Sequence, residues 1–127
     1  MPDMNQALTP ICALALALVL AAAPVNAEWV KIGTSRTAVH YVDSATVRKD
    51  GNLRRVWAMQ NMVEASEAGV RSIRALQEYD CALQRFRYVT VEAHTGPMAG
   101  GWVLARHEVQ DGWSDRVSAI GKMVCRD

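Results

Sequence analysis

The sequence predicts an α+β domain: a single antiparallel sheet of about six strands, with a C-terminal helix packed on one face of the sheet. Three observations support this prediction. Apolar and polar side chains alternate with period two between turn residues through residues 28–109. After residue 113 the period changes to the 3.6 residues of a helix. Finally, Cys81 and Cys125 fall where a disulfide would tether the helix to the sheet.

An export signal is expected at the N-terminus. Residues 11–23 form an apolar run of thirteen side chains, shorter than the roughly 20 that span a bilayer but typical of a signal peptide. Pro24 breaks the run, and Val25 and Ala27 occupy the −3 and −1 positions of a cleavage site. We therefore expect residues 1–27 to be a signal peptide that touches the membrane only transiently. An uncleaved membrane anchor is the alternative.

The remaining residues 28–127 are enough for one domain and too few for two. All 14 basic residues and 12 of the 13 acidic residues lie in this part, so its formal net charge is 14 − 12 = +2. An exported domain with so small a charge is not expected to bind nucleic acid.

Two cysteines remain in this domain, because Cys12 lies inside the expected signal. Exported domains usually pair an even number of thiols, so we predict a Cys81–Cys125 disulfide. The loop-entropy model gives such a link about 4 kcal/mol of stabilisation, a large share of the roughly 5–15 kcal/mol that is typical of a folded domain.

In the N-terminal half, residues 28–32 and 38–42 are expected as strands, and a helical turn capped by Asp43 or Ser44 follows. Residues 49–52 predict a hairpin turn, because Gly and Asn adopt positive φ at little cost. Residues 53–62 then form a long strand with two mixed faces. Its alternation places Arg55, Trp57 and Met59 on one face and Arg54, Val56 and Ala58 on the other.

Three further strands are expected at residues 70–81, 85–95 and 102–109, joined by a turn at 82–84 and a flexible loop at 96–101. In the first, the more apolar face holds Ile73, Ala75, Gln77, Tyr79 and Cys81, and the other face holds Arg74, Leu76, Glu78 and Asp80. In the second, the alternation places Val89, Val91 and Ala93 opposite Phe86, Tyr88, Thr90 and His94.

The last segment predicts a short helix that begins at Ser114 as its N-cap. One helical stripe carries Val117, Ile120, Gly121, Val124 and Cys125. This apolar stripe must pack against the sheet, toward which Cys81 also points. Periodicity and thiol pairing therefore agree on the same arrangement.

Catalytic and metal-binding patterns are absent from the sequence. His40, His94 and His107 are 54 and 13 residues apart and do not follow the spacing of metal ligands. The chain has neither a Gly-x-Ser-x-Gly motif nor a Gly-rich loop between a strand and a helix. We therefore predict a protein that is not an enzyme and carries no cofactor or metal.

Arginine residues give the better candidate for a binding surface. Six of them fall on three successive expected strands, interleaved with Trp57, Tyr79, Phe86 and Tyr88. On one sheet face their guanidinium groups would bind sulfated glycans, phospholipid headgroups or an acidic protein patch. The alternative is that Glu78, Asp80 and Glu92 neutralise them in cross-strand pairs. The candidate ligand-binding residues are Arg54, Arg55, Arg74, Arg85 and Arg87, with Arg71 nearby, and loop 96–101 is a second candidate contact.

Several segments together resemble the surface-adhesin protein E family of Gram-negative bacteria. They are the stretches Ala27–Lys31, Tyr41–Ser44, Val47–Gly51, Val56–Trp57, Tyr79–Cys81, Arg85–Tyr88, Gly96–Met98 and Val124–Cys125. The resemblance covers essentially the whole domain. It implies an antiparallel sheet with a disulfide-tethered helix, and an outer-membrane adhesin that binds host extracellular-matrix and serum proteins and forms dimers.

These observations predict an exported, non-enzymatic binding module of the periplasm or outer cell surface. Its expected partners are host matrix proteins or sulfated glycans, contacted through a sheet face or loop 96–101, and a homodimer is an expected assembly. The alternative is a periplasmic structural or envelope-accessory protein with a bacterial envelope partner. An enzyme of unrecognised type is a third reading, and it would need a deep polar pocket with clustered titratable side chains.

Overall fold

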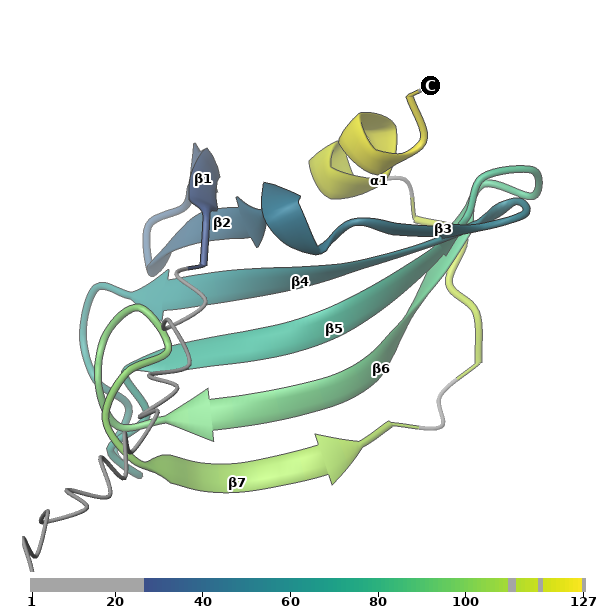
Figure 1. Ribbon diagram of the computed structural model, residues 1–127. Coiled ribbons are helices and arrows are strands. Elements are labelled where there is room, and N and C mark those ends of the chain that lie inside the picture. Colours follow the sequence, from purple (N-terminus) through teal and green to yellow (C-terminus); the bar gives the residue numbers. More distant parts are fainter. Residues whose placement is uncertain (1–26, 110–111, 117, 127) are drawn as a thin grey trace, which may run out of the picture.

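A computed structural model describes residues 27–109, 112–116 and 118–126 of the chain, in which one antiparallel sheet dominates (Figure 1). The sheet follows the order β1-β2-β4-β5-β6-β7, with β3 paired to β4 outside this path. It has seven strands, not the six or so that were predicted. The strands are β1 (Trp29–Thr34), β2 (Ala38–Asp43), β3 (Arg48–Asp50), β4 (Leu53–Met62), β5 (Ser72–Asp80), β6 (Arg85–His94) and β7 (Val103–Glu108).

Strand β3 is the additional one, and it exists because β2 covers only part of β4. β2 pairs with residues 58–62 of β4, and the chain then makes the 3-10 turn η1 (Ser44–Thr46), capped by Asp43, one of the two predicted caps. Beyond this turn, β3 pairs with residues 53–55 of the same strand. The Thr46 hydroxyl accepts a hydrogen bond of 3.1 Å from the Trp57 amide, which fills the gap between the two pairings.

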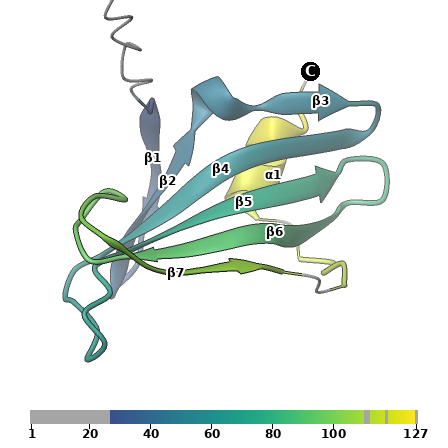
Figure 2. The ribbon, with the colours of Figure 1, turned by 60° about the horizontal axis from the view of Figure 1, so that its bottom comes forward.

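The connections gather at the two ends of the sheet (Figure 2). Turn 35–37, loop 63–71 and loop 95–102 meet at one end, which we call the loop end. They are joined there by the hydrogen bonds Val63 N–Thr37 O of 2.9 Å and Arg71 N–His94 O of 2.8 Å. The opposite end, which we call the disulfide end, holds turns 51–52 and 81–84.

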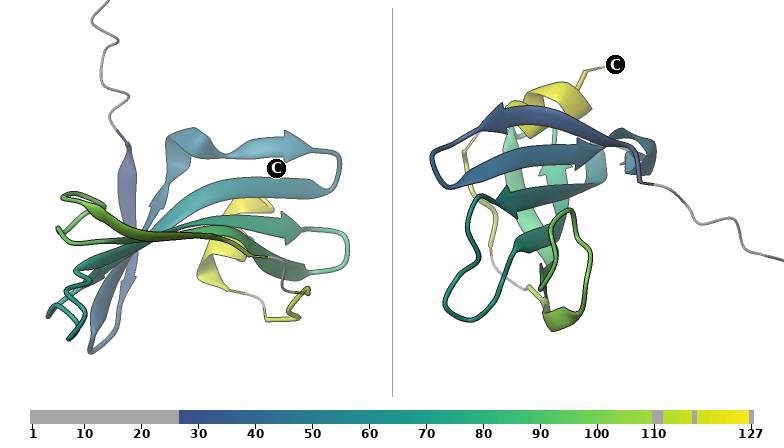
Figure 3. Two further views of the ribbon diagram at one scale, coloured as in Figure 1. Left: turned by 90° about the horizontal axis from the view of Figure 1, so that it is seen from below. Right: turned by 90° about the vertical axis from the view of Figure 1, so that its left-hand side faces the viewer.

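Helix α1 (Ala119–Val124) lies over one face of the sheet, and β1 and β2 curl toward the same side (Figures 1 and 3). We call this side the helix face. The core is formed here by six buried side chains, Val42, Val56, Ala58, Tyr79, Ile120 and Val124. The helical stripe predicted from the sequence is therefore confirmed for Ile120, Gly121 and Val124, which are all buried; Val117 lies outside the described residues.

The helix begins later than predicted. Ser118 is its N-cap and accepts a hydrogen bond of 3.1 Å from the Gly121 amide. Ser114, the predicted cap, instead extends the sheet, because its amide and carbonyl both bond to Phe86 at 2.7 and 2.9 Å. This bridge takes the place of the first predicted turn of helix.

The predicted alternation along β6 is wrong at one point. Gln77 pairs with Tyr88 and Leu76 pairs with Thr90, so Val89 is an extra residue in β6. Phe86 and Tyr88 consequently share the helix face with Val91 and Ala93, rather than opposing them. Thr90 and His94 lie on the other face, as their pairing with Leu76 and Ser72 requires.

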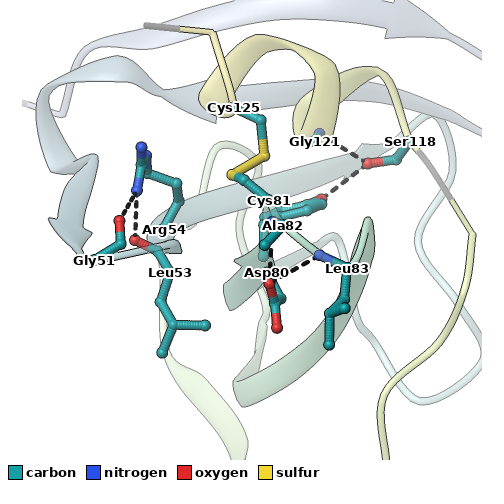
Figure 4. The surroundings of a disulfide bond; sticks show 11 residues. Gly51, Leu53, Arg54, Asp80, Cys81, Ala82, Leu83, Ser118, Gly121 and Cys125 are labelled. Carbon is teal, nitrogen blue, oxygen red and sulfur yellow. Dashed lines mark hydrogen bonds between the residues drawn. A yellow bond between two sulfur atoms is a disulfide. The ribbon is translucent and has the colours of Figure 1, made fainter.

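The predicted disulfide is present and joins the end of β5 to the end of α1, with its Cα atoms 5.5 Å apart (Figure 4). The fold class predicted from the sequence is thus confirmed. The expected signal, residues 1–27, lies outside the described residues except for Ala27. Across the ranges given above, no helix is both long and apolar enough to cross a membrane.

Candidate functional site

Four of the five predicted arginines share the face opposite the helix, which we call the arginine face. Arg55 in β4, Arg74 in β5 and Arg85 and Arg87 in β6 occupy register positions that alternate with the core residues. Arg54 lies on the helix face instead. It is 8% exposed and donates from one terminal nitrogen to the carbonyls of Gly51 and Leu53, at 2.7 and 3.0 Å. One face therefore holds four of the five candidate arginines, and Arg54 lies on the opposite face from Arg55, as the alternation along residues 53–62 predicts.

Buried carboxylates pair with these four arginines. Glu78, whose side chain is 3% exposed, accepts from Arg55 at 2.6 Å and from Arg87 at 2.7 Å. Glu92 lies 3.4 Å from Arg74 and Asp80 lies 3.5 Å from Arg85. The cross-strand pairs weighed as the alternative are therefore present. Much of the charge on this face is neutralised within it.

Glu78 is held in its ionised form by its two arginines. Burial by itself raises the pKa of this carboxyl group, because it disfavours the charged state. Hydrogen bonds and attraction from Arg55 and Arg87 outweigh the burial, and the net result is a pKa below the ordinary value of 4.5. Glu78 is therefore a fixed negative charge that organises the centre of the arginine face.

The aromatic partners on this face differ from those predicted. Trp57 is present, with the Arg74 guanidinium 3.8 Å from its ring centre. Tyr79, Phe86 and Tyr88 lie on the helix face, where Phe86 contacts both tyrosine rings. Their place is taken by Trp113, whose ring centre is 4.5 Å from both Arg85 and Arg87. The spacing of residues along the strands could not predict that Trp113 contacts these arginines, because Trp113 lies after the last strand.

At the loop end, apolar side chains are exposed instead of buried. Five of the eight exposed large apolar side chains among the described residues lie in or beside this end. They are Val63 (56% exposed), Met98 (39%), Trp102 (80%), Val103 (53%) and Leu104 (48%). A concentration of this kind is typical of an interaction surface.

Hydrogen bonds hold loop 95–102 in one conformation despite an unfavourable backbone. Met98 and Ala99 have φ of 57° and 58°, a region that residues with a Cβ rarely occupy. The Met98 amide donates to Asn61 Oδ1 at 2.8 Å, and the Ala99 amide donates to Ser72 Oγ at 2.9 Å. Within the loop, the Trp102 amide donates to Thr95 Oγ1 at 2.8 Å. Strain that is maintained in this way is often associated with function.

Within the described part of the chain, no three His, Cys, Asp or Glu side chains gather closely enough to hold a metal ion. The arginine face offers an ordered array of charges, and the loop end offers a preformed apolar projection. Both are suited to binding.

Comparisons with known proteins agree with this description. The family model described as surface-adhesin protein E matches residues 29–126. A solved structure of protein E from Haemophilus influenzae in its selenomethionine form is 16% identical, covers 76% of this chain and 94% of that one, and has a TM-score of 0.50. A second crystal form of that protein is 14% identical, with coverages of 76% and 95% and a TM-score of 0.49. No curated protein matches the chain. At this level of identity the selenomethionine structure shows a shared fold, whereas the family model matches most of the chain. This chain therefore belongs to the surface-adhesin protein E family.

Proposed function

We propose that this domain is an exported, non-enzymatic adhesin-like module that binds a protein partner through the loop end of its sheet. Membership of a surface-adhesin family supports the adhesin-like role. The observation that carries the choice of surface is Trp102, which is 80% exposed on a strained and hydrogen-bonded loop. A large aromatic side chain held ready in this way is the kind of anchor that dominates binding energy at interfaces.

The proposed partners are matrix proteins of a host, and the proposed location is the outer cell surface. A protein partner is favoured over a charged glycan at this end because Val63, Met98 and Trp102 present large exposed apolar side chains there. Burial of Trp102 and Met98 against an apolar patch would stabilise a complex by about 25 cal/mol for each Å² removed from water. Preorganisation of the loop lowers the entropy that binding would otherwise cost.

The experiment is a binding assay of residues 28–127 on immobilised matrix proteins at physiological salt. We expect Trp102→Ala and Met98→Ala to weaken binding at least tenfold. Leu83→Ala is the matched control, because Leu83 is 63% exposed but lies in turn 81–84 at the disulfide end. Absence of binding by the unaltered domain, or an equal loss in the Leu83 variant, would contradict the proposal.

The arginine face is the second candidate contact surface. Although its carboxylates are paired, the side chains of Arg55 and Arg106 remain 49% and 58% exposed. Sulfated glycans are the ligand class that guanidinium groups on this face suit. If Arg74→Ala and Arg87→Ala leave the binding of sulfated glycans unchanged, this face is structural only.

A periplasmic role with an envelope partner is the alternative to adhesion. Cell fractionation separates the two possibilities: surface exposure of the protein supports adhesion, and a purely periplasmic pool supports the envelope role.

A further inference from the structure

A pocket lies at the disulfide end, away from the proposed contact surface. It has a volume of about 390 Å³ and is walled by the Cys81–Cys125 disulfide and by Gly121, together with Tyr79, Asp80 and Gln84. Three cations also line it: Arg85 from β6, Arg116 from the segment before α1, and Lys122 from the last turn of α1. Among the described residues that line it, Asp80 is the only one with a carboxylate.

Asp80 is already engaged and does not neutralise the three cations. Its Oδ1 atom accepts from the amides of Ala82 and Leu83, each at 3.1 Å, which shapes turn 81–84 (Figure 4). Its Oδ2 atom lies 3.5 Å from Arg85 Nε. With one negative charge against three positive charges, the described lining residues carry a net charge of +2.

Two of the cations have no partner among the described residues. Neither the Arg116 guanidinium nor the Lys122 ammonium makes an ion pair or hydrogen bond there, and only their main-chain amides are bonded. Arg85 is oriented by stacking on Trp113 at 4.5 Å, yet its buried Nε makes no hydrogen bond. Arg116 and Lys122 therefore have donors available to a ligand, and Arg85, whose side chain is 33% exposed, adds a third positive charge.

We propose that this pocket binds a tetrahedral oxyanion, either a sulfate ester or a phosphate group, through Arg85, Arg116 and Lys122. Guanidinium and ammonium groups are the side chains that recognise such anions. The volume exceeds that of an oxyanion and falls in the range of ligand sites, so it also accommodates part of a sugar carrying the group. The proposal goes beyond the function assigned to the loop end and does not depend on it.

The test is binding of three probes to residues 28–127: inorganic sulfate, inorganic phosphate and a heparin-derived tetrasaccharide, by calorimetry and amide NMR shifts. We expect at least one probe to bind, with shifts centred on Cys81, Gln84 and Gly121. Affinity should fall as NaCl is raised, because the contacts are ionic. Preference for the tetrasaccharide or sulfate identifies sulfate esters as the ligand, and preference for phosphate identifies phosphate groups.

The double variant R116Q/K122Q is expected to lose at least tenfold in affinity while keeping the thermal midpoint of unfolding, since both side chains are exposed. The matched control is K31Q/R36Q, which removes the same charge from β1 and from turn 35–37 at the loop end. Equal weakening by both double variants would mean that net charge binds the probe and would overturn the proposal. Failure of every probe to bind would overturn it as well.

Discussion

Gly121 of α1 packs directly against the ring of Tyr79 in β5. A Cβ atom at position 121 would lie 2.8 Å from Cε1 and 2.9 Å from Cδ1 of that ring, closer than carbon atoms approach. The absence of a side chain at Gly121 therefore sets how closely the helix approaches the sheet.

Gly121→Ala is expected to destabilise the domain, although replacement of a helical glycine by alanine usually stabilises by about 1 kcal/mol. The steric cost of moving α1 or Tyr79 should reverse the sign, giving a net loss of about 1–2 kcal/mol. Chemical denaturation measures it. In the double variant that also carries Tyr79→Leu, the loss of stability should be smaller than the sum of the losses in the two single variants. If the double loss equals that sum, the contact has no energetic role.

Tyr79→Phe is expected to change how stability depends on alkaline pH. Burial raises the pKa of Tyr79 from 10.0 to about 12; a hydrogen bond from Ser118 lowers it in part, and Tyr88 raises it further. The folded state therefore holds the phenol proton more tightly than the unfolded state, and stability falls as pH rises from 10 toward 12. The phenylalanine variant should lose less stability across this interval.

The same variant should be less stable by about 1 kcal/mol at neutral pH, because it loses the hydrogen bonds of the Tyr79 hydroxyl to Gln77 and Ser118. Tyr41→Phe, on β2, is the control. If Tyr79→Phe and Tyr41→Phe both show the same pH profile of stability as the unaltered domain, the buried phenol of Tyr79 does not account for the stability lost at alkaline pH.

Glu78→Gln should destabilise the domain at neutral pH by about 2 kcal/mol, because it leaves Arg55 and Arg87 without their buried counter-charge. The pKa of Glu78 is lowered in the folded state, so its contribution is present above pH 4.5 and is lost as pH falls through the folded value. The variant should therefore show a shallower acid dependence of its free energy of unfolding. Glu64→Gln, in exposed loop 63–71, should leave the profile unchanged.

Gly101→Ala should disrupt the loop end more than Gly69→Ala does. Both glycines have positive φ, of 69° and 82°, so each substitution costs about 1 kcal/mol in backbone strain. At Gly101 an added Cβ would also collide with Thr95 Oγ1 and approach the Gly96 amide nitrogen to 2.7 Å, whereas Gly69 faces open space. Denaturation and partner binding should both show the larger effect at Gly101. Equal effects would mean that the loop adapts freely.

Most of the fold follows from the sequence because alternation and turn residues are local signals. Strand β3 was missed because three exposed residues, Arg48–Asp50, show no alternation; only the incomplete cover of β4 by β2 gives them a partner. The extra residue at Val89 was missed for a similar reason. A one-residue irregularity reverses the faces of a strand, and pairing with β5 reveals it.

The candidate surfaces were less predictable because they depend on contacts between distant segments. The pairing of Glu78 with two arginines requires three strands in register. Trp113 reaches the arginine face from outside any strand. One feature of the sequence indicates that Trp102 is exposed, namely its position directly after the glycines of loop 96–101. Nothing in the sequence indicates that Asn61 and Ser72 fix this loop.

The Cys81–Cys125 bond also bears on how the molecule would survive outside the cell. A protease that cuts once between these two cysteines would release no fragment, because both pieces stay covalently joined. The nicked molecule would migrate as one species on a non-reducing gel and as two after reduction. Helix α1 would stay attached to the end of β5, so a single cut in this interval could not separate the helix from the sheet.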